Sequence, residues 1–354
     1  MGGAGASSDG SGGLPGNASG GSPGAAGSEP ACFEPIALEP LPAAIEFLVD
    51  SSGSLRETWM DETTRWQFVR DALVDSFSSM PTESATGLVF YPNVQWSAGI
   101  DGEGEDFCLL TYESAPIAEL SDGHRSELLA AVEQQPTLGA TPTHDAYEYA
   151  ISLLVEKSAG RRAKAAVLVT DGAPTYAQGC VGDGVTPVDG EPLADAARDA
   201  FVAHGIRTFV IGISGGFESL SEMALAGGTP RPGCGTELGF PCHFDASTSP
   251  SPAAFLESAL SRIEREARRC VLAAPETAPD NADFTLIKLV SPSGESTLLQ
   301  HFAPGAACTE GIMHFEDSGT YVLCPQTCTY FSAAPELRVE LEFGCSDLPT
   351  PESK

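Results

Sequence analysis

The stretch FLVDSSGSL at residues 47–55 places one aspartate and three serines directly after the apolar end of a predicted buried strand. A capped turn would explain this pattern, because Asp and Ser side chains accept hydrogen bonds from backbone N–H groups and Gly53 tolerates positive φ. Asp50, Ser52 and Ser54 also form a D-x-S-x-S array whose alternate oxygens can converge on one hard cation. Choosing between these interpretations requires partners from elsewhere in the chain.

The apolar run that ends at Asp50 is one of several strand-like runs, which alternate with segments of helical periodicity over residues 42–270. That alternation is typical of a parallel sheet covered by helices on both faces. We therefore predict an α/β fold with a doubly wound, mostly parallel six-stranded sheet. The predicted strands are residues 45–50, 87–91, 108–112, 165–170, 206–213 and a short one near 243–245. Apolar stripes predict core-facing helices over residues 66–80 and 255–267.

The two ends of the chain differ from this central part. Residues 1–31 are mostly Gly, Ser, Ala and Pro, which cannot bury enough apolar area to offset chain entropy, so we expect a disordered tether. After Cys270 the pattern changes to four short apolar runs that predict antiparallel strands: residues 284–290, 296–302, 320–325 and 337–343. We thus expect a domain over residues 42–270, followed by a small cysteine-rich β module over residues 271–349 that disulfides help to stabilise.

The composition of the 354-residue chain excludes some classes of partner. Its formal charge is -31, from 18 Lys and Arg against 49 Asp and Glu, and this charge repels phosphate backbones and anionic membrane surfaces. Apolar residues make up 42% of the chain, enough for a substantial core, but no apolar run approaches the roughly 20 residues that cross a bilayer. We therefore expect no nucleic-acid partner and no membrane span.

The ten cysteines are even in number and spread over the folded part of the chain, which favours disulfides formed in an oxidising compartment. Zinc is the competing interpretation, but Cys324 and Cys328 have no second cysteine or histidine pair to accompany them. We expect a secreted or cell-surface protein. No export signal is visible in residues 1–31, so this expectation depends on the cysteines alone.

Polar side chains follow several of the predicted strands at the edge where open α/β sheets bind ligands. The first strand ends in Asp50, with Ser52 and Ser54 after it, and the strand AAVLVT ends in Asp171. The stretch LGATPTHDAYEYA places Thr141 in a loop just before a helix. Three separate loops therefore offer hard oxygen ligands at one edge of the sheet.

These three motifs, D-x-S-x-S, G-x-T-P-T and T-D-G in that order, resemble the von Willebrand factor type A domain and its metal-ion-dependent adhesion site. The resemblance covers residues 42–270, and the cysteine-rich β module is similar to tails on secreted bacterial proteins of this class. The family pattern implies Mg²⁺ with Ser52 and Ser54 as direct ligands and Thr141 as a direct or water-bridged one. It implies that Asp50 and Asp171 hold coordinated waters.

The resemblance implies a binding function that the chemistry of Mg²⁺ supports. Mg²⁺ prefers six oxygen ligands in octahedral geometry, and a site built mainly of hydroxyls and water-holding carboxylates keeps an exchangeable position. The Asp or Glu carboxylate of a partner protein can fill that position. We expect a secreted or surface-tethered metal-dependent protein-binding module, not an enzyme, with Mg²⁺ as the ion and Mn²⁺ or Ca²⁺ as alternatives.

A serine hydrolase is the alternative hypothesis, because GISGG at residues 212–216 matches the G-x-S-x-G nucleophile elbow around Ser214 and follows a predicted strand. Asp245 and His301 follow in the required order. His301, however, lies beyond the predicted domain boundary, and no H-G-G-G oxyanion loop occurs upstream. This hypothesis also leaves the metal-site motifs unexplained.

The predicted topology suggests disulfide pairings. The loops after the second and fourth strands meet at one edge, which predicts Cys108–Cys180, and closeness in sequence predicts Cys234–Cys242. Cys32 and the end of the last helix lie at the opposite edge, which predicts Cys32–Cys270. That bond would oppose the helix slide known in integrin-type members of the resembling family, so we expect constitutive binding. The remaining cysteines, Cys308, Cys324, Cys328 and Cys345, would pair among themselves in one of three ways.

Overall fold

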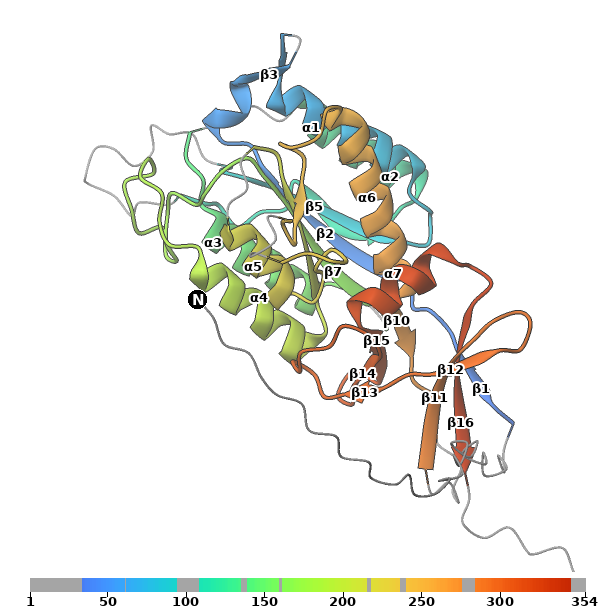
Figure 1. The fold of residues 1–354 in the computed structure, drawn as a ribbon. Coiled ribbons are helices and arrows are strands. Elements are labelled where there is room, and N and C mark those ends of the chain that lie inside the picture. The colour runs from blue at the N-terminus through green and yellow to red at the C-terminus, as the bar shows by residue number, and fades with distance from the viewer. Residues whose placement is uncertain are drawn as a thin grey trace, which may run out of the picture.

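The computed structural model describes residues 34–60, 62–93, 108–134, 139–158, 161–214, 218–235, 240–275 and 284–344. An α/β unit forms one end of the molecule, and a β-rich module packs against the other end; most of the module is drawn orange and red in Figure 1, and its first strand is blue. The predicted tether over residues 1–31 lies outside the described residues. Within the described part of the chain, no helix has the length and apolar composition needed to cross a membrane.

The α/β unit is built on a six-stranded sheet in the order β6-β5-β2-β7-β8-β9. These strands are β2 (Ala43–Asp50), β5 (Ala85–Tyr91), β6 (Ala115–Glu119), β7 (Ala163–Thr170), β8 (Arg207–Gly212) and β9 (Phe244–Asp245). All neighbours are parallel except β6, which runs antiparallel to β5. The predicted doubly wound, mostly parallel sheet is confirmed. Strand order reverses between β2 and β7, so the ligand-binding edge of this fold is where these two strands end.

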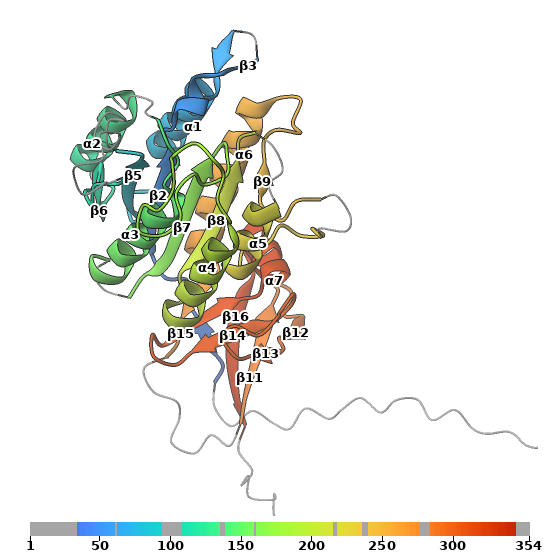
Figure 2. The ribbon, with the colours of Figure 1, turned by 90° about the vertical axis from the view of Figure 1, so that its left-hand side faces the viewer.

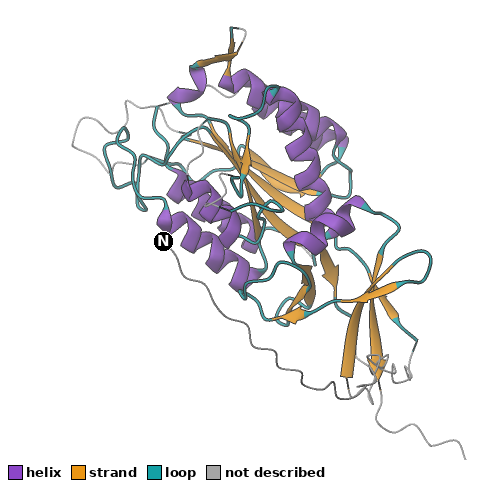
Figure 3. Ribbon diagram, viewed as in Figure 1, coloured by secondary structure: helices purple, strands orange, loops and turns teal. Residues whose placement is uncertain are grey.

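Helices cover both faces of the sheet (Figure 3). One face packs against α1 (Arg65–Ser79), α2 (Asp122–Gln134) and α6 (Pro252–Arg269), and the other packs against α3 (Thr143–Glu156), α4 (Glu191–His204) and α5 (Glu218–Ala226). Side chains of β2 alternate between the two cores: Phe47 faces the first, and Leu48 faces the second. Burial on both faces explains why the central strands are continuous apolar runs without an exposed polar face.

The predicted strand over residues 108–112 is wrong. These residues are irregular, and the antiparallel edge strand β6 starts later, at Ala115. The prediction assumed that the apolar residues of this stretch are buried in the sheet, but Leu110 is 46% exposed and does not face the core. The backbone of Leu110 bonds to the side chain of Asn93 and not to a neighbouring strand. Leu110 N–H donates to Asn93 Oδ1 at 2.7 Å, and the Leu110 carbonyl oxygen accepts from Asn93 Nδ2 at 2.6 Å.

Glu46, in the middle of β2, is a buried carboxyl at the interface with α3. It is fully buried, and within the described residues neither carboxyl oxygen has a hydrogen-bond partner. A Cβ atom on Gly87 of the neighbouring strand would overlap this carboxyl, so the glycine provides the room for it. Burial, followed by the charge of Glu113, raises the pKa of Glu46 well above its ordinary value, against a smaller lowering by Lys157.

In its described residues, the β-rich module contains two four-stranded sheets and one helix, and Figure 2 shows their arrangement. One sheet has the order β1-β16-β11-β12, and the other has the order β10-β15-β14-β13. Their bounds are β1 (Ile36–Leu38), β10 (Val271–Ala273), β11 (Phe284–Val290), β12 (Ser296–Leu298), β13 (His301–Phe302), β14 (Ile312–Phe315), β15 (Thr320–Leu323) and β16 (Arg338–Gly344). The sequence did not predict β1, β10, β14 or the helix α7 (Pro325–Ala333). The one antiparallel strand predicted over residues 296–302 is two strands, β12 and β13, and β13 runs parallel to β14. Because β1 pairs with β16, the module includes chain from both sides of the α/β unit.

Disulfides connect several of these elements. Cys108–Cys180 and Cys234–Cys242 confirm the predictions, and Cys308–Cys324 is one of the pairings left open within the module. Cys270 pairs with Cys328, so the predicted Cys32–Cys270 bond is wrong, and so is the prediction that Cys328 pairs with another of the module cysteines. The reason lies in the pairing of β10, which begins directly after Cys270. β10 pairs with β15, and α7 follows β15 in the chain, so Cys328 of α7 lies next to the C-terminal end of α6. Cys32 and Cys345 lie outside the described residues.

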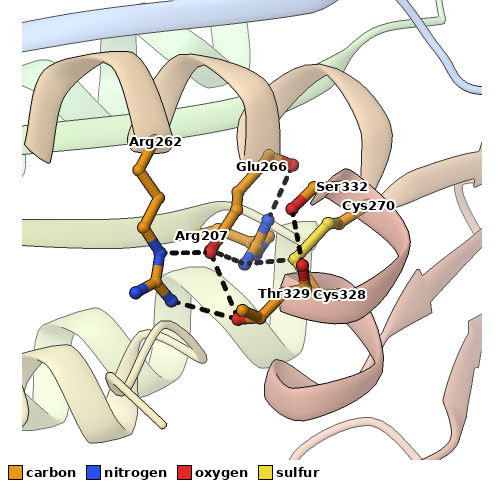
Figure 4. Close-up of a disulfide and its surroundings, with 7 residues drawn as sticks. All are labelled: Arg207, Arg262, Glu266, Cys270, Cys328, Thr329 and Ser332. Atoms are coloured by element: carbon orange, nitrogen blue, oxygen red, sulfur yellow. Dashed lines mark hydrogen bonds and ion pairs between the residues drawn. A yellow bond between two sulfur atoms is a disulfide. The ribbon is translucent and has the colours of Figure 1, made fainter. Parts of the chain in front are cut away.

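A buried ionic network accompanies that disulfide where α6 meets α7 (Figure 4). Arg207 on β8 is 1% exposed and donates to the Glu266 carbonyl oxygen at 3.1 Å, with its Nη2 atom 3.6 Å from Glu266 Oε2. Arg262 donates to Glu266 Oε1 at 2.7 Å and to Thr329 Oγ1 of α7 at 3.0 Å. The Thr329 hydroxyl also donates to Glu266 Oε1 at 3.3 Å, so Thr329 of the module is tied to both Arg262 and Glu266 of the α/β unit.

Candidate metal centre

Asp50 and the two serines after it form the first part of the site, at the end of β2. Asp50 Oδ1 accepts a hydrogen bond from Ser52 N–H at 2.8 Å, and Asp50 Oδ2 accepts one from the Thr170 hydroxyl at 2.7 Å. The hydroxyl oxygens of Ser52 and Ser54 lie 2.9 Å apart. The 3₁₀ helix that follows, Gly53–Arg56, has no side-chain cap from Ser52. Asp50 thus forms the turn, while the Ser52 hydroxyl bonds to the Ser54 hydroxyl instead of capping the helix.

Asp171 forms the second part, at the end of the adjacent strand β7. Its Oδ1 atom accepts a hydrogen bond from the Ser54 hydroxyl at 2.7 Å. The line of polar groups from Ser52 through Ser54 to Asp171 therefore joins two loops that are more than a hundred residues apart in the sequence. Parallel strands end at the same edge of a sheet, so this convergence follows from the topology.

Thr141 lies in the third loop, just before α3, and is buried. Its N–H donates to the Thr175 hydroxyl at 2.8 Å, and its carbonyl oxygen accepts from Thr175 N–H at 2.9 Å. Gly53 N–H donates to the Gly139 carbonyl oxygen at 3.0 Å, which joins the third loop to the first. Each pair of the three loops is therefore hydrogen-bonded, although the hydrogen bonds of Thr141 come from its backbone.

The two carboxylates of the site are poorly solvated, with Asp50 1% exposed and Asp171 3% exposed. Burial, and then the charge of Asp171, raise the pKa of Asp50 to about 7. Burial also raises the pKa of Asp171, although the Ser54 hydroxyl and Arg65 oppose that effect. Negative charge in such a place is stabilised by a cation, and the available donors are carboxylate and hydroxyl oxygens, which suit Mg²⁺. The residues present fit a hard divalent ion.

Arg65, the first residue of α1, is a member of the site that the sequence did not predict. Its Nη1 atom lies 3.0 Å from Asp171 Oδ2 and 3.0 Å from Glu57 Oε2, and donates to the Ser54 carbonyl oxygen at 3.3 Å. The sequence around Arg65 does not indicate a contact with Asp171, because that contact depends on the direction in which α1 leaves the first loop. Arg65 partly neutralises Asp171.

The residues of the hydrolase hypothesis do not form a triad within the described part of the chain. The Ser214 hydroxyl donates to the Asp171 carbonyl oxygen at 2.6 Å, and Asp245 accepts from the Ser247 N–H and hydroxyl groups. His301 lies on β13 of the module, and no hydrogen bond joins it to either residue within the described chain. Residues 215–217, which complete the GISGG motif, lie outside the described residues.

The doubly wound sheet and the three hydrogen-bonded polar loops at its carboxyl edge define a class of α/β ligand-binding domain. The chain belongs to the von Willebrand factor type A domain family, whose model matches residues 45–234. No curated protein sequence matches the chain.

Comparison with solved structures finds similar chains at low sequence identity. A von Willebrand factor type A protein from Catenulispora acidiphila is 15% identical with a TM-score of 0.44, over 87% of this chain and 60% of that one. The type V pili tip protein Mfa5 from Porphyromonas gingivalis is 11% identical with a TM-score of 0.43, over 64% of this chain and 95% of that domain. Proximal thread matrix protein 1 from the mussel byssus, described with a zinc-occupied MIDAS motif, is 16% identical with a TM-score of 0.42, over 67% of this chain and 51% of that one. Function has to be argued from the site itself.

Proposed function

We propose that this chain is a metal-dependent protein-binding module and not an enzyme. The observation that carries the proposal is the pair of buried carboxylates, Asp50 and Asp171, at the ends of adjacent strands. Asp50 accepts from Ser52 N–H, and the hydroxyls of Ser52 and Ser54 continue this connection to Asp171. Burying two carboxylates close together is unfavourable unless a cation or a proton compensates them. Arg65 lies on one side of the pair and also contacts Glu57, so a divalent ion would compensate the remaining negative charge.

Mg²⁺ is the ion we propose, with Mn²⁺ or Ca²⁺ as alternatives, because every donor of the set is an oxygen atom. Ser52, Ser54 and Thr141 would supply hydroxyl ligands, and Asp50 and Asp171 would orient waters bound to the ion. Bound Mg²⁺ would supply a positive centre with a coordination position for an oxygen from outside. The hydrogen bonds that Asp50 accepts from Ser52 N–H and the Thr170 hydroxyl hold that carboxylate in place for this task.

The ligand we propose is an Asp or Glu carboxylate on a partner protein. A carboxylate gains a charge-assisted bond to the ion, whereas the rest of this strongly acidic chain repels it. The metal centre would therefore determine where an acidic partner side chain can dock. The described disulfides favour an oxidising compartment, so we place this binding outside the cell, in a secreted or surface-tethered protein.

Isothermal titration with Mg²⁺ and with Mn²⁺ tests the metal centre. We expect one site in the parent chain and none in Asp50→Ala or Asp171→Ala. Asp195→Ala is the matched control, because Asp195 is an exposed carboxylate on α4 that pairs with the exposed Arg198. A parent that binds no metal, or an Asp50→Ala variant that binds as well as the control, would refute the proposal.

The hydrolase alternative has its own test. A fluorophosphonate probe labels serines that an adjacent base activates, and the Ser214 hydroxyl donates to a backbone carbonyl instead of to a histidine. We therefore expect no labelling of the parent chain. Labelling that Ser214→Ala abolishes would show that the protein is an enzyme.

A further inference from the structure

Four large apolar side chains are exposed on two loops at the carboxyl edge of the sheet. We call them the apolar rim: Leu110 and Tyr112 (each 46% exposed), Val181 (65%) and Val185 (68%). Single exposed apolar residues are common on protein surfaces and need no explanation. A set of them on connected loops beside a candidate ligand site is a candidate contact surface.

The apolar rim is connected to the candidate metal centre. The loop that carries Val181 and Val185 begins directly after Asp171, and its Thr175 exchanges hydrogen bonds with Thr141. The Cys108–Cys180 disulfide joins this loop to the one that carries Leu110 and Tyr112, with the two Cα atoms 5.4 Å apart. Both loops lie at the end of the sheet away from the module (Figure 1).

Hydrogen bonds hold the backbone of the Val181 loop in place. Asp145 of α3 accepts from Gly179 N–H at 2.9 Å and from Cys180 N–H at 3.1 Å. Ala177 and Val181 exchange two backbone hydrogen bonds, at 2.8 and 3.2 Å. Farther along the loop, Asp183 accepts from Val185 N–H at 2.8 Å. A loop held in this way displays its apolar side chains in one arrangement, which lowers the entropy lost when a partner binds.

We infer that the apolar rim is the second half of the partner-binding surface, and that the partner segment carries a large apolar side chain next to its metal-binding carboxylate. This inference rests on the proposed function. Charge supports the choice of occupant, because a chain with a formal charge of -31 tolerates one metal-paired carboxylate but repels further acidic residues beside it. The occupant is therefore a segment of another protein with an isolated Asp or Glu flanked by Leu, Ile, Val, Phe or Trp.

Selection from a random peptide library displayed on phage tests the inference on the full chain without knowledge of the natural partner. Phage bound in Mg²⁺ are eluted with EDTA and sequenced. We expect an Asp or Glu with a large apolar residue within two positions of it. One such synthetic peptide is then titrated against the parent, Val181→Ser/Val185→Ser and a Leu298→Ser/Tyr330→Ser control. The control residues are each 61% exposed and lie on the module.

The rim variant should bind the peptide roughly tenfold more weakly than the parent, because two apolar contacts are lost, while its Mg²⁺ titration stays unchanged. The control should bind as the parent does. Val185→Thr, which keeps the shape of the side chain, should show a smaller loss of the same kind and guards against misfolding of the double variant.

The outcomes separate the inference from the proposed function. If Mg²⁺ binds but no selected peptide elutes with EDTA, the proposed function is wrong, and the inference falls with it. If the eluted peptides carry Asp or Glu with polar neighbours, or if Val181→Ser/Val185→Ser binds a selected peptide as well as the parent, the inference is wrong and the metal-dependent function stands.

Discussion

Replacing Glu266 by glutamine should strongly destabilise the protein, because this side chain compensates two arginines, Arg207 and Arg262, where α6 meets α7 of the module. Glu266 is 4% exposed and Arg207 is 1% exposed, so solvent cannot stabilise the charge of either residue if the other charge is lost. Arg262, which donates to Glu266 Oε1 at 2.7 Å, would lose the negative charge of its partner as well, although its hydrogen bond to Thr329 would remain. The substitution keeps the shape of the side chain and removes its charge.

The expected loss follows from the burial of these groups. Removing one partner of a buried ion pair typically costs about 3–5 kcal/mol of the free energy of unfolding. For domains of this size, about 1 kcal/mol lowers the melting temperature by about 2–4 °C. We therefore expect the melting temperature of Glu266→Gln to fall by about 6–20 °C relative to the parent.

Differential scanning calorimetry at neutral pH measures this change. Glu264→Gln is the matched control on the same helix, because Glu264 and its partner Arg268 both reach solvent, with side chains 14% and 32% exposed. A pair of that kind contributes about 0–1 kcal/mol, so the control should melt within a few degrees of the parent. Equal melting temperatures for the two variants would refute the claim that the buried network stabilises this junction.

Three other predictions concern single sites. Arg65→Gln removes a positive charge 3.0 Å from Asp171, so Mg²⁺ affinity measured by titration should rise roughly threefold to tenfold, and a fall would contradict this reasoning. Glu46 keeps its proton in the folded state, because burial raises its pKa well above 4.5, so stability should fall as pH rises from about 4.5 through the raised pKa. Glu46→Gln should therefore raise the melting temperature at pH 8 and not at pH 4, and an equal effect at both pH values would show that charge is not the cause. Non-reducing peptide mapping should link Cys32 to Cys345, since the described disulfides use all the other cysteines and these two adjoin β1 and β16 in the sequence; a free thiol at either position would contradict this.

The sheet could be predicted from the sequence because its central strands are buried on both faces and therefore appear as uninterrupted apolar runs. The residues of the candidate site could be found for a related reason. Asp50 and Asp171 directly follow two such runs, and parallel strands bring their carboxyl ends to one edge. Their hydrogen bonds to neighbouring loops agree with that placement, while metal binding itself stays a prediction.

The errors arise where tertiary contacts decide the structure. The apolar residues at 108–112 suggest a strand, but the Cys108–Cys180 disulfide and hydrogen bonds to the side chain of Asn93 hold that segment as a loop. The Cys270–Cys328 bond depends on the pairing of β10 with β15. The spacing of the cysteines in the sequence does not indicate that pairing. Likewise, Arg65 reaches Asp171 only because of the direction in which α1 leaves the first loop.

Anomalous diffraction from a crystal soaked with Mn²⁺ tests the metal centre most directly. Mn²⁺ takes the same oxygen ligands as Mg²⁺ and scatters strongly enough to be located by its own signal. The account predicts one strong peak within bonding distance of the Ser52 and Ser54 hydroxyl oxygens, with Asp50 and Asp171 around it. A crystal with no peak among these residues, or with its only strong peak elsewhere on the chain, would contradict the account.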